Sequence, residues 1–131
     1  MTAADWPVAH HRGSAAEFHA RSIPDQPGPA LWWFEVERPA LVLGSTQRDD
    51  VVDADTAEAA GVEVARRRSG GGAVFLQPGE TIWIDVILPA DDPRWEHDVG
   101  RSFGWLGEAW VRVLRELGVT GAEAHAGPLL R

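Results

Sequence analysis

The residues with the clearest chemical potential lie between Arg66 and Gly79, where three arginines precede three glycines. Gly70, Gly71 and Gly72 carry no Cβ, so a ligand can approach their main-chain N–H groups closely. An arginine side chain beside such bare donors can bind an anionic oxygen of a phosphate or a carboxylate. The stretch therefore predicts a binding site for an anionic group.

The arginines belong to a strand that we expect over Val62 to Arg68. Side chains alternate in direction along a strand, so Arg67 is expected to point opposite to Arg66 and Arg68. One arginine, or two, can then face the glycines. Each part of the pattern is common by itself, because glycine triplets also mark ordinary turns and three basic residues usually form a solvated strand edge.

The complete string from Arg66 to Phe75, Arg-Arg-x-Ser-Gly-Gly-Gly-Ala-Val-Phe, closely resembles the signature of the lipoate-protein ligase family. This family belongs to a larger group with the biotin ligases and the octanoyltransferases. The resemblance covers roughly residues 30 to 119, in the same order as in the family. It includes a Trp-containing strand, a strand ending in Gly-x-x-Gln and a short helix, here Leu31 to Val36, Ala40 to Gln47 and Asp53 to Ala60.

The resemblance implies an ATP-dependent reaction. In that family the carboxylate of lipoate, octanoate or a related acyl group attacks the α-phosphorus of ATP, and an acceptor-domain lysine then attacks the acyl-adenylate. Mg²⁺ is expected to arrive with ATP, bridging its phosphates. By resemblance Arg67 contacts the adenylate or the carboxylate. The implied substrate- and ATP-binding residues are Arg67, Ser69, Gly70, Gly71, Gly72, Ala73, Val74, Phe75, Gly44 and Gln47.

All 12 residues counted as Lys or Arg are arginine, and the chain contains no lysine. The family's catalytic lysine follows the part of the fold that these residues resemble. No catalytic residue is therefore assigned, and this chain alone is expected to be inactive. The implied partners are a lipoyl acceptor domain of a 2-oxoacid dehydrogenase or glycine cleavage protein, and a C-terminal partner chain.

Two alternatives remain open. An acyltransferase of the octanoyl type uses a cysteine and no ATP. A non-catalytic acyl- or adenylate-binding subunit of a two-chain ligase would need no lysine of its own.

Composition sets further bounds. With 131 residues, 44% of them hydrophobic, the chain is expected to form one domain over residues 1–131, incomplete by comparison with the family. The formal net charge of −8 argues against nucleic acid and against an anionic membrane, because both bind basic faces. The chain has no cysteine, no signal-like N-terminus and no apolar run of the ~18 residues that would span a bilayer. These features predict a cytoplasmic protein.

The fold that must position the glycines is expected to be α+β, a mixed, mainly antiparallel sheet with helices on one face, like the front half of the family's catalytic domain. Ser14 is placed to begin one short helix, and either Asp53 or Asp55 to begin another. Short turns predict two antiparallel pairs, Ala30–Val36 with Ala40–Gly44 and Ala73–Gln77 with Thr81–Leu88.

A longer helix is expected from about Asp98 to Leu117. Its apolar stripe consists of Val99, Phe103, Leu106, Trp110, Val113 and Leu117.

The remaining candidates for chemistry are weaker. The histidines are His10, His11, His19, His97 and His125, and none falls in a metal-binding spacing. Most of the 7 tryptophans are expected in the core, although Trp32, Trp33 or Trp83 could wall an apolar acyl pocket.

Overall fold

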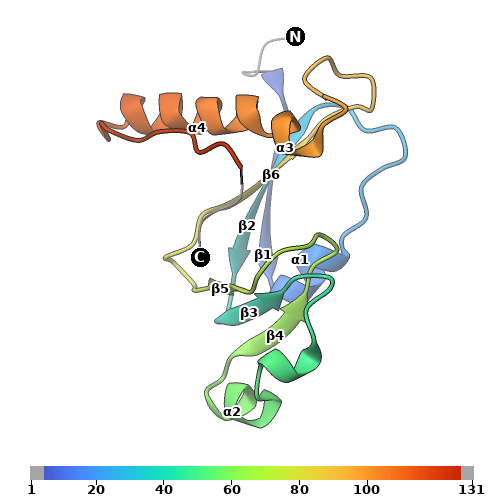
Figure 1. Cartoon of the computed structure of the whole chain (residues 1–131), viewed down its shortest axis with the longest axis vertical. Helices are drawn as coiled ribbons and strands as arrows, with labels where there is room; N and C mark the ends of the chain where they lie inside the picture. Colours follow the sequence, from blue (N-terminus) through green and yellow to red (C-terminus); the bar gives the residue numbers. More distant parts are fainter. Residues whose placement is uncertain (1–4, 128–131) are drawn as a thin grey trace. The chain divides into compact units, whose positions relative to one another are not determined.

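The computed structural model describes residues 5–127 and divides the chain into two compact units, Met1–Pro89 and Ala90–Arg131. The combination of helices and strands confirms the α+β class (Figure 1). The first unit contains β1 (Val8–Gly13), α1 (Ala15–Ala20), β2 (Ala30–Val36), β3 (Ala40–Leu43), the 3-10 helix η2 (Asp49–Val51), α2 (Ala54–Ala59), β4 (Glu63–Arg66), β5 (Val74–Leu76) and β6 (Trp83–Ile87). The second unit contains α3 (Val99–Ser102) and α4 (Gly104–Glu116).

The strands of the first unit form two three-stranded sheets where the sequence predicted one. In the sheet β1-β2-β6, which we call the tryptophan sheet, β2 runs parallel to β1 and antiparallel to β6. In the sheet β4-β3-β5, which we call the glycine-loop sheet, β3 runs parallel to β4 and antiparallel to β5. Both sheets are therefore mixed, as predicted.

The predicted pairing of β2 with β3 is wrong, because the chain crosses from one sheet to the other between them. Val36 and Ala40, on either side of the crossing, are 8% and 0% exposed, so both lie in the core. Pro39 has no N–H to donate to a ladder with β2, and its carbonyl accepts from the Glu63 N–H at 2.9 Å. The crossing thus begins the parallel pairing of β3 with β4.

The predicted hairpin of β5 with β6 is also wrong, although its turn forms. Gly79 has φ +75°, and the Glu80 N–H donates to the Gln77 carbonyl at 3.2 Å. The Gln77 N–H, however, donates to the side-chain hydroxyl of Thr81 at 3.0 Å rather than to a strand carbonyl. No ladder starts there, and β5 and β6 each pair with a strand of a different sheet.

The core of the first unit is built from α1 and both sheets. Phe34 on β2 is 1% exposed, and its ring centroid lies 4.6 Å from that of Phe18 on α1 and 5.0 Å from that of Trp83 on β6. The face of β6 that carries Trp83 is therefore the buried one, while Ile82 and Ile84 are 73% and 38% exposed. The buried cluster comprises Ala15, Phe18, Phe34, Val36, Ala40, Val42, Ala65 and Leu76.

Both predicted helix starts are confirmed. The Glu17 N–H donates to the Ser14 hydroxyl and the Ser14 N–H to the Glu17 carboxylate, each at 3.1 Å, which is the reciprocal capping box. Asp53 accepts from the Thr56 N–H at 3.0 Å at the start of α2.

The predicted longer helix is interrupted at Phe103, which divides it into α3 and α4. Leu106 and Trp110 are half-buried, as the predicted stripe requires. The other members, Val99, Phe103, Val113 and Leu117, are exposed. The predicted stripe is therefore wrong for these four residues. Among residues 5–127, no helix is both long and apolar enough to cross a bilayer.

Candidate functional site

Most of the predicted site residues come from two segments that meet at one edge of the glycine-loop sheet, whereas Arg67 follows β4 and Val74 and Phe75 begin β5. The glycine loop (Ser69–Ala73) connects β4 to β5, and the Gly44–Gln47 turn follows β3. Because β3 runs parallel to β4 and antiparallel to β5, the ends of these strands that carry the two segments lie at the same edge (Figure 1). The Ser45 N–H donates to the Ser69 carbonyl at 2.9 Å and joins the segments directly.

The two segments touch where both backbones are glycine. A Cβ on Gly44 would lie 2.0 Å from the carbonyl oxygen of Gly71, a distance that real side chains do not tolerate. Gly71 itself has φ +103°, a conformation that side chains rarely adopt. The close approach therefore requires glycine on both sides.

Arg67 faces the glycine loop, whereas strand alternation predicted only that it points opposite to Arg66 and Arg68. Its Nη2 donates to the carbonyls of Gly70 and Gly72, both at 2.8 Å, and its Nη1 donates to the Val42 carbonyl at 3.3 Å. The guanidinium thus holds the loop carbonyls on its own side. A contact of Arg67 with an adenylate or carboxylate stays a prediction.

The N–H groups of the glycine loop are not held in this way. The main-chain N–H groups of Gly70, Gly71 and Gly72 donate to no acceptor within the described part of the chain, and all three residues are exposed. With the carbonyls of Gly70 and Gly72 held by the Arg67 guanidinium, these N–H groups form a set of donors for an external anion.

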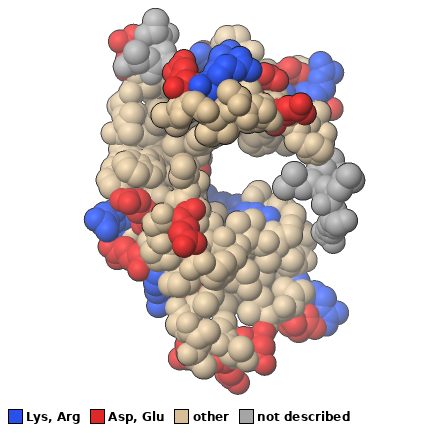
Figure 2. Space-filling view, turned by 90° about the vertical axis from the view of Figure 1, so that its left-hand side faces the viewer, with Lys and Arg blue, Asp and Glu red and all other residues tan. Residues whose placement is uncertain are grey.

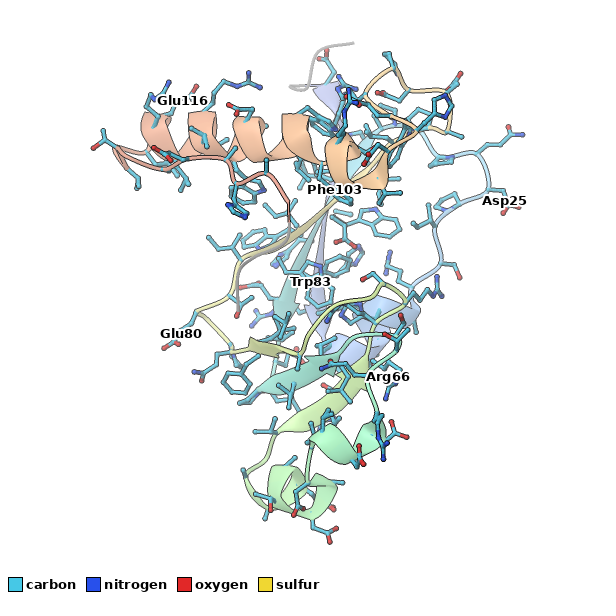
Figure 3. All side chains as sticks on the ribbon, viewed as in Figure 1. Asp25, Arg66, Glu80, Trp83, Phe103 and Glu116 are labelled. Atoms are coloured by element: carbon cyan, nitrogen blue, oxygen red, sulfur yellow. The ribbon has the colours of Figure 1, made fainter. Side chains whose placement is uncertain are left out.

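Arg66 ends β4 (Figure 3), and its side chain points to the Gly44–Gln47 turn. Its Nη1 donates to the carbonyls of Gly44 and Gln47, both at 2.7 Å, and its Nη2 binds the carboxylate of Asp49. Arg68 is exposed and makes no hydrogen bond or ion pair with residues 5–127. The divergence of Arg66 from Arg67 was predicted, but the binding of Arg66 to the Gly44–Gln47 turn was not. The acidic Asp49, two residues after Gln47, is the signal that could have indicated it.

The three candidate tryptophans do not share a face. Trp32 and Trp83 pack against the core, whereas Trp33 points to the opposite side of the tryptophan sheet and stacks on His10 with ring centroids 4.2 Å apart. The Arg21 guanidinium lies over the Trp32 ring at 4.9 Å. Trp32 and Trp83 are therefore the pair that one apolar group could contact together.

Two histidines lie beside these tryptophans. His19 packs against Trp83 with ring centroids 4.6 Å apart and ring planes tilted by 35°. The pKa of His19 is lowered chiefly by burial, with Asp85 acting in the opposite sense and Arg67 in the same sense. His11 stacks on Phe34, and its buried Nε2 has no hydrogen-bond partner among the described residues. Burial lowers the pKa of His11 as well, so its neutral form is favoured.

Among the described residues, neither charged side chains nor metal-ligating side chains form a second candidate site. On the face drawn in Figure 2, the basic side chains of the described residues lie in separate small groups beside acidic ones. In the range 5–127, no three His, Cys, Asp or Glu side chains come together in a group that could hold a metal ion.

The sequence profile of the lipoyl protein ligase A/B catalytic domain matches residues 14–127, which include both loop segments and both arginines. The chain belongs to this family. The match runs through both compact units.

Two curated relatives bear this out. Over 101 residues, 77% of this chain, it is 31% identical to the lipoate-protein ligase A subunit 1 of Thermoplasma acidophilum. Over 85 residues, 63% of this chain, it is 33% identical to the octanoyltransferase of Roseiflexus sp. (strain RS-1). The matched regions span only 36% and 34% of those relatives, so the chain corresponds to about a third of their length.

Solved structures show the same fold. A bi-partite lipoate protein ligase from T. acidophilum, studied with its E2 lipoyl domain, matches 95% of this chain with a TM-score of 0.73 and 27% identity, over 48% of its own length. A lipoate-protein ligase A bound with ATP matches 95% of this chain with a TM-score of 0.71 over 53% of its own length, and at 24% identity it supports the fold alone.

Proposed function

We propose that this chain is the glycine-loop portion of a lipoate-protein ligase and binds lipoate, or a related acyl group such as octanoate, as its adenylate. The observation that carries the proposal is the set of N–H groups at Gly70, Gly71 and Gly72, which have no acceptor among the described residues. Family membership supports the same assignment, because the glycines lie within the matched residues 14–127.

The chemistry gives these donors a defined task. When a carboxylate oxygen bonds to the α-phosphorus of ATP, the bond from that phosphorus to pyrophosphate breaks and negative charge builds on phosphate oxygens. Fixed N–H donors aimed at such oxygens stabilise the charge without reorganising. Mg²⁺, when bound with ATP, would neutralise part of the phosphate charge.

The other predicted site residues have supporting tasks in this proposal. Arg67 holds the loop through the carbonyls of Gly70 and Gly72 and so keeps the N–H groups turned outward. Val74 and Phe75, which follow the loop, are 48% and 51% exposed and offer an apolar surface to the acyl chain or the adenine ring. The remaining members of the predicted set, Gly44, Gln47, Ser69 and Ala73, shape the two segments.

The partners follow from the reaction. We propose that a second chain, or the part of the ligase that this chain does not match, supplies the catalytic lysine, and that the acceptor is a lipoyl domain of a 2-oxoacid dehydrogenase or glycine cleavage protein. The bi-partite T. acidophilum ligase supports both points by analogy. We further propose that both units belong to one incomplete catalytic domain, because the family match runs from residue 14 to residue 127. The cytoplasmic location stays a prediction.

Isothermal titration tests the proposal with four ligands, namely a non-hydrolysable lipoyl-adenylate analogue, ATP with Mg²⁺, lipoate and octanoate. We expect the analogue to bind most tightly, because it engages the loop and the apolar surface together. Arg67→Ala should weaken analogue binding by about tenfold to a hundredfold, because we propose that Arg67 also contacts the adenylate and a hydrogen bond from a charged group contributes roughly 1.5–3 kcal/mol. Arg68→Ala, with circular dichroism as the folding check, is the matched control. Failure of the unaltered protein to bind the analogue would contradict the proposal.

The octanoyltransferase alternative has an observation of its own, the 33% identity to the Roseiflexus enzyme. Dependence on ATP separates the two activities. Incubation of this chain alone with lipoate or octanoate, ATP, Mg²⁺ and a lipoyl domain should leave the acceptor unmodified by mass spectrometry. Octanoylation from an octanoyl thioester without ATP would favour the transferase instead.

A further inference from the structure

Two neighbouring arginines each hold one segment of the site by its main-chain carbonyls. Arg67 binds two carbonyls of the glycine loop, and Arg66 binds two carbonyls of the Gly44–Gln47 turn. Because Arg66 ends β4 and Arg67 follows it directly, their side chains leave the backbone in opposite directions. One short stretch of chain thereby fixes both segments.

The Gly44–Gln47 turn depends on the Arg66 guanidinium. The Gly44 carbonyl accepts from the Gln47 N–H at 3.2 Å and from Arg66 at 2.7 Å, while the Gly44 N–H donates to the Gln47 side chain at 2.9 Å. Asp49 binds the second nitrogen of the same guanidinium. A planar guanidinium can reach two carbonyls and a carboxylate at once, whereas an ammonium group lacks this fixed fork.

The Gly44–Gln47 turn also constrains the position of the glycine loop. The Ser45 N–H donates to the Ser69 carbonyl at 2.9 Å, and Gly44 lies so close to Gly71 that there is no room for a Cβ. A shift of the turn towards the loop therefore has to move Gly71, whose N–H is one of the three proposed anion donors, and a shift away breaks the Ser45–Ser69 hydrogen bond.

We propose that Arg66 is a positioning residue for the anion site. Its guanidinium holds the Gly44–Gln47 turn against the glycine loop and so sets the direction of the loop N–H groups, without itself touching the ligand. The inference rests on the proposed function for the nature of the ligand, while the holding of the turn is independent of it.

The test compares Arg66→Ala, Arg66→Lys and Arg68→Ala with the unaltered protein by two readouts. Amide hydrogen exchange followed by NMR reports on the N–H groups of Ser45 and Gln47. Titration with the non-hydrolysable lipoyl-adenylate analogue reports on the site. In Arg66→Ala both amides should exchange at least tenfold faster, and the analogue should bind about tenfold more weakly. On a logarithmic scale, Arg66→Lys should restore less than half of the lost amide protection and less than half of the lost affinity. Arg68→Ala should change neither quantity.

Each outcome decides the proposal. Unchanged exchange at Ser45 and Gln47 in Arg66→Ala would overturn it, as would faster exchange with unchanged analogue affinity. Equal losses in Arg66→Ala and Arg68→Ala would also overturn it, because they would indicate a general effect of positive charge. If Arg66→Ala does not fold, Arg66→Lys carries the same comparison with the charge retained. Absence of analogue binding to the unaltered protein would refute the proposed function, and the exchange data would still decide whether Arg66 holds the turn.

Discussion

The two sheets of the first unit are stabilised by different interactions. The tryptophan sheet is packed by rings, with Phe34 in contact with Phe18 and Trp83. The site edge of the glycine-loop sheet is held by two charged guanidinium groups bound to main-chain carbonyls. Burial of apolar surface is non-directional, whereas hydrogen bonds fix positions. The first region should therefore determine stability, and the second should determine the geometry of the anion site.

The largest effect on stability is expected at Phe34. Phe34→Ala removes a ring that is 1% exposed and should lower the free energy of unfolding by about 3–5 kcal/mol. Chemical denaturation measures the change, with Trp33→Ala as an aromatic control, because Trp33 is 41% exposed on the opposite face. Equal losses of stability in the two variants would show that the face of β2 that carries Phe34 is not the core face.

A smaller effect is expected at Glu63, which links the glycine-loop sheet to α1. Its side chain is 7% exposed and accepts from the N–H groups of Ala16 at 3.0 Å and Ala15 at 3.3 Å. Glu63→Ala leaves these donors without that partner and should destabilise the protein by about 1–3 kcal/mol. Glu58→Ala, on the exposed surface of α2, is the matched control. The same loss in both variants would refute a specific role for Glu63.

The smallest effect concerns pH and the ring-packed region. The pKa of His11 is lowered in the folded protein by burial and by the charges of Arg21 and His10. A histidine whose pKa is lower in the folded protein does not oppose folding above its unfolded pKa of about 6.5, where it is neutral in both states. As the pH falls from there towards the folded pKa, the stability of the folded protein decreases. The denaturation midpoint should therefore drop between pH 7.5 and pH 5.5, and less so in His11→Phe. An identical drop in both proteins would show that His11 does not cause the pH dependence.

Local features of the fold were predictable from the sequence because local residues determine them. The capping box at Ser14, the cap at Asp53 and the turn at Gly79 each depend on side chains and dihedral angles within a few residues. The divergence of Arg67 from Arg66 followed from strand alternation, which does not say which of the two faces the loop.

Strand pairing was not predictable in this way, because a short turn between two strands does not say whether they pair. Both wrong hairpins lie where the chain passes from one sheet to the other, at Pro39 and at Thr81. The task of Arg66 was missed for the same reason, since its partners Gly44 and Gln47 are 22 and 19 residues away in sequence.

The central claim is that the glycine loop N–H groups bind the anionic part of the ligand. The most direct measurement is a two-dimensional amide NMR titration of the ¹⁵N-labelled chain with the non-hydrolysable lipoyl-adenylate analogue. The account predicts that the amides of Gly70, Gly71 and Gly72 shift most and move together with ligand concentration, because they are exposed and donate to no described residue. Largest shifts elsewhere, with these three amides unmoved at saturation, would contradict it.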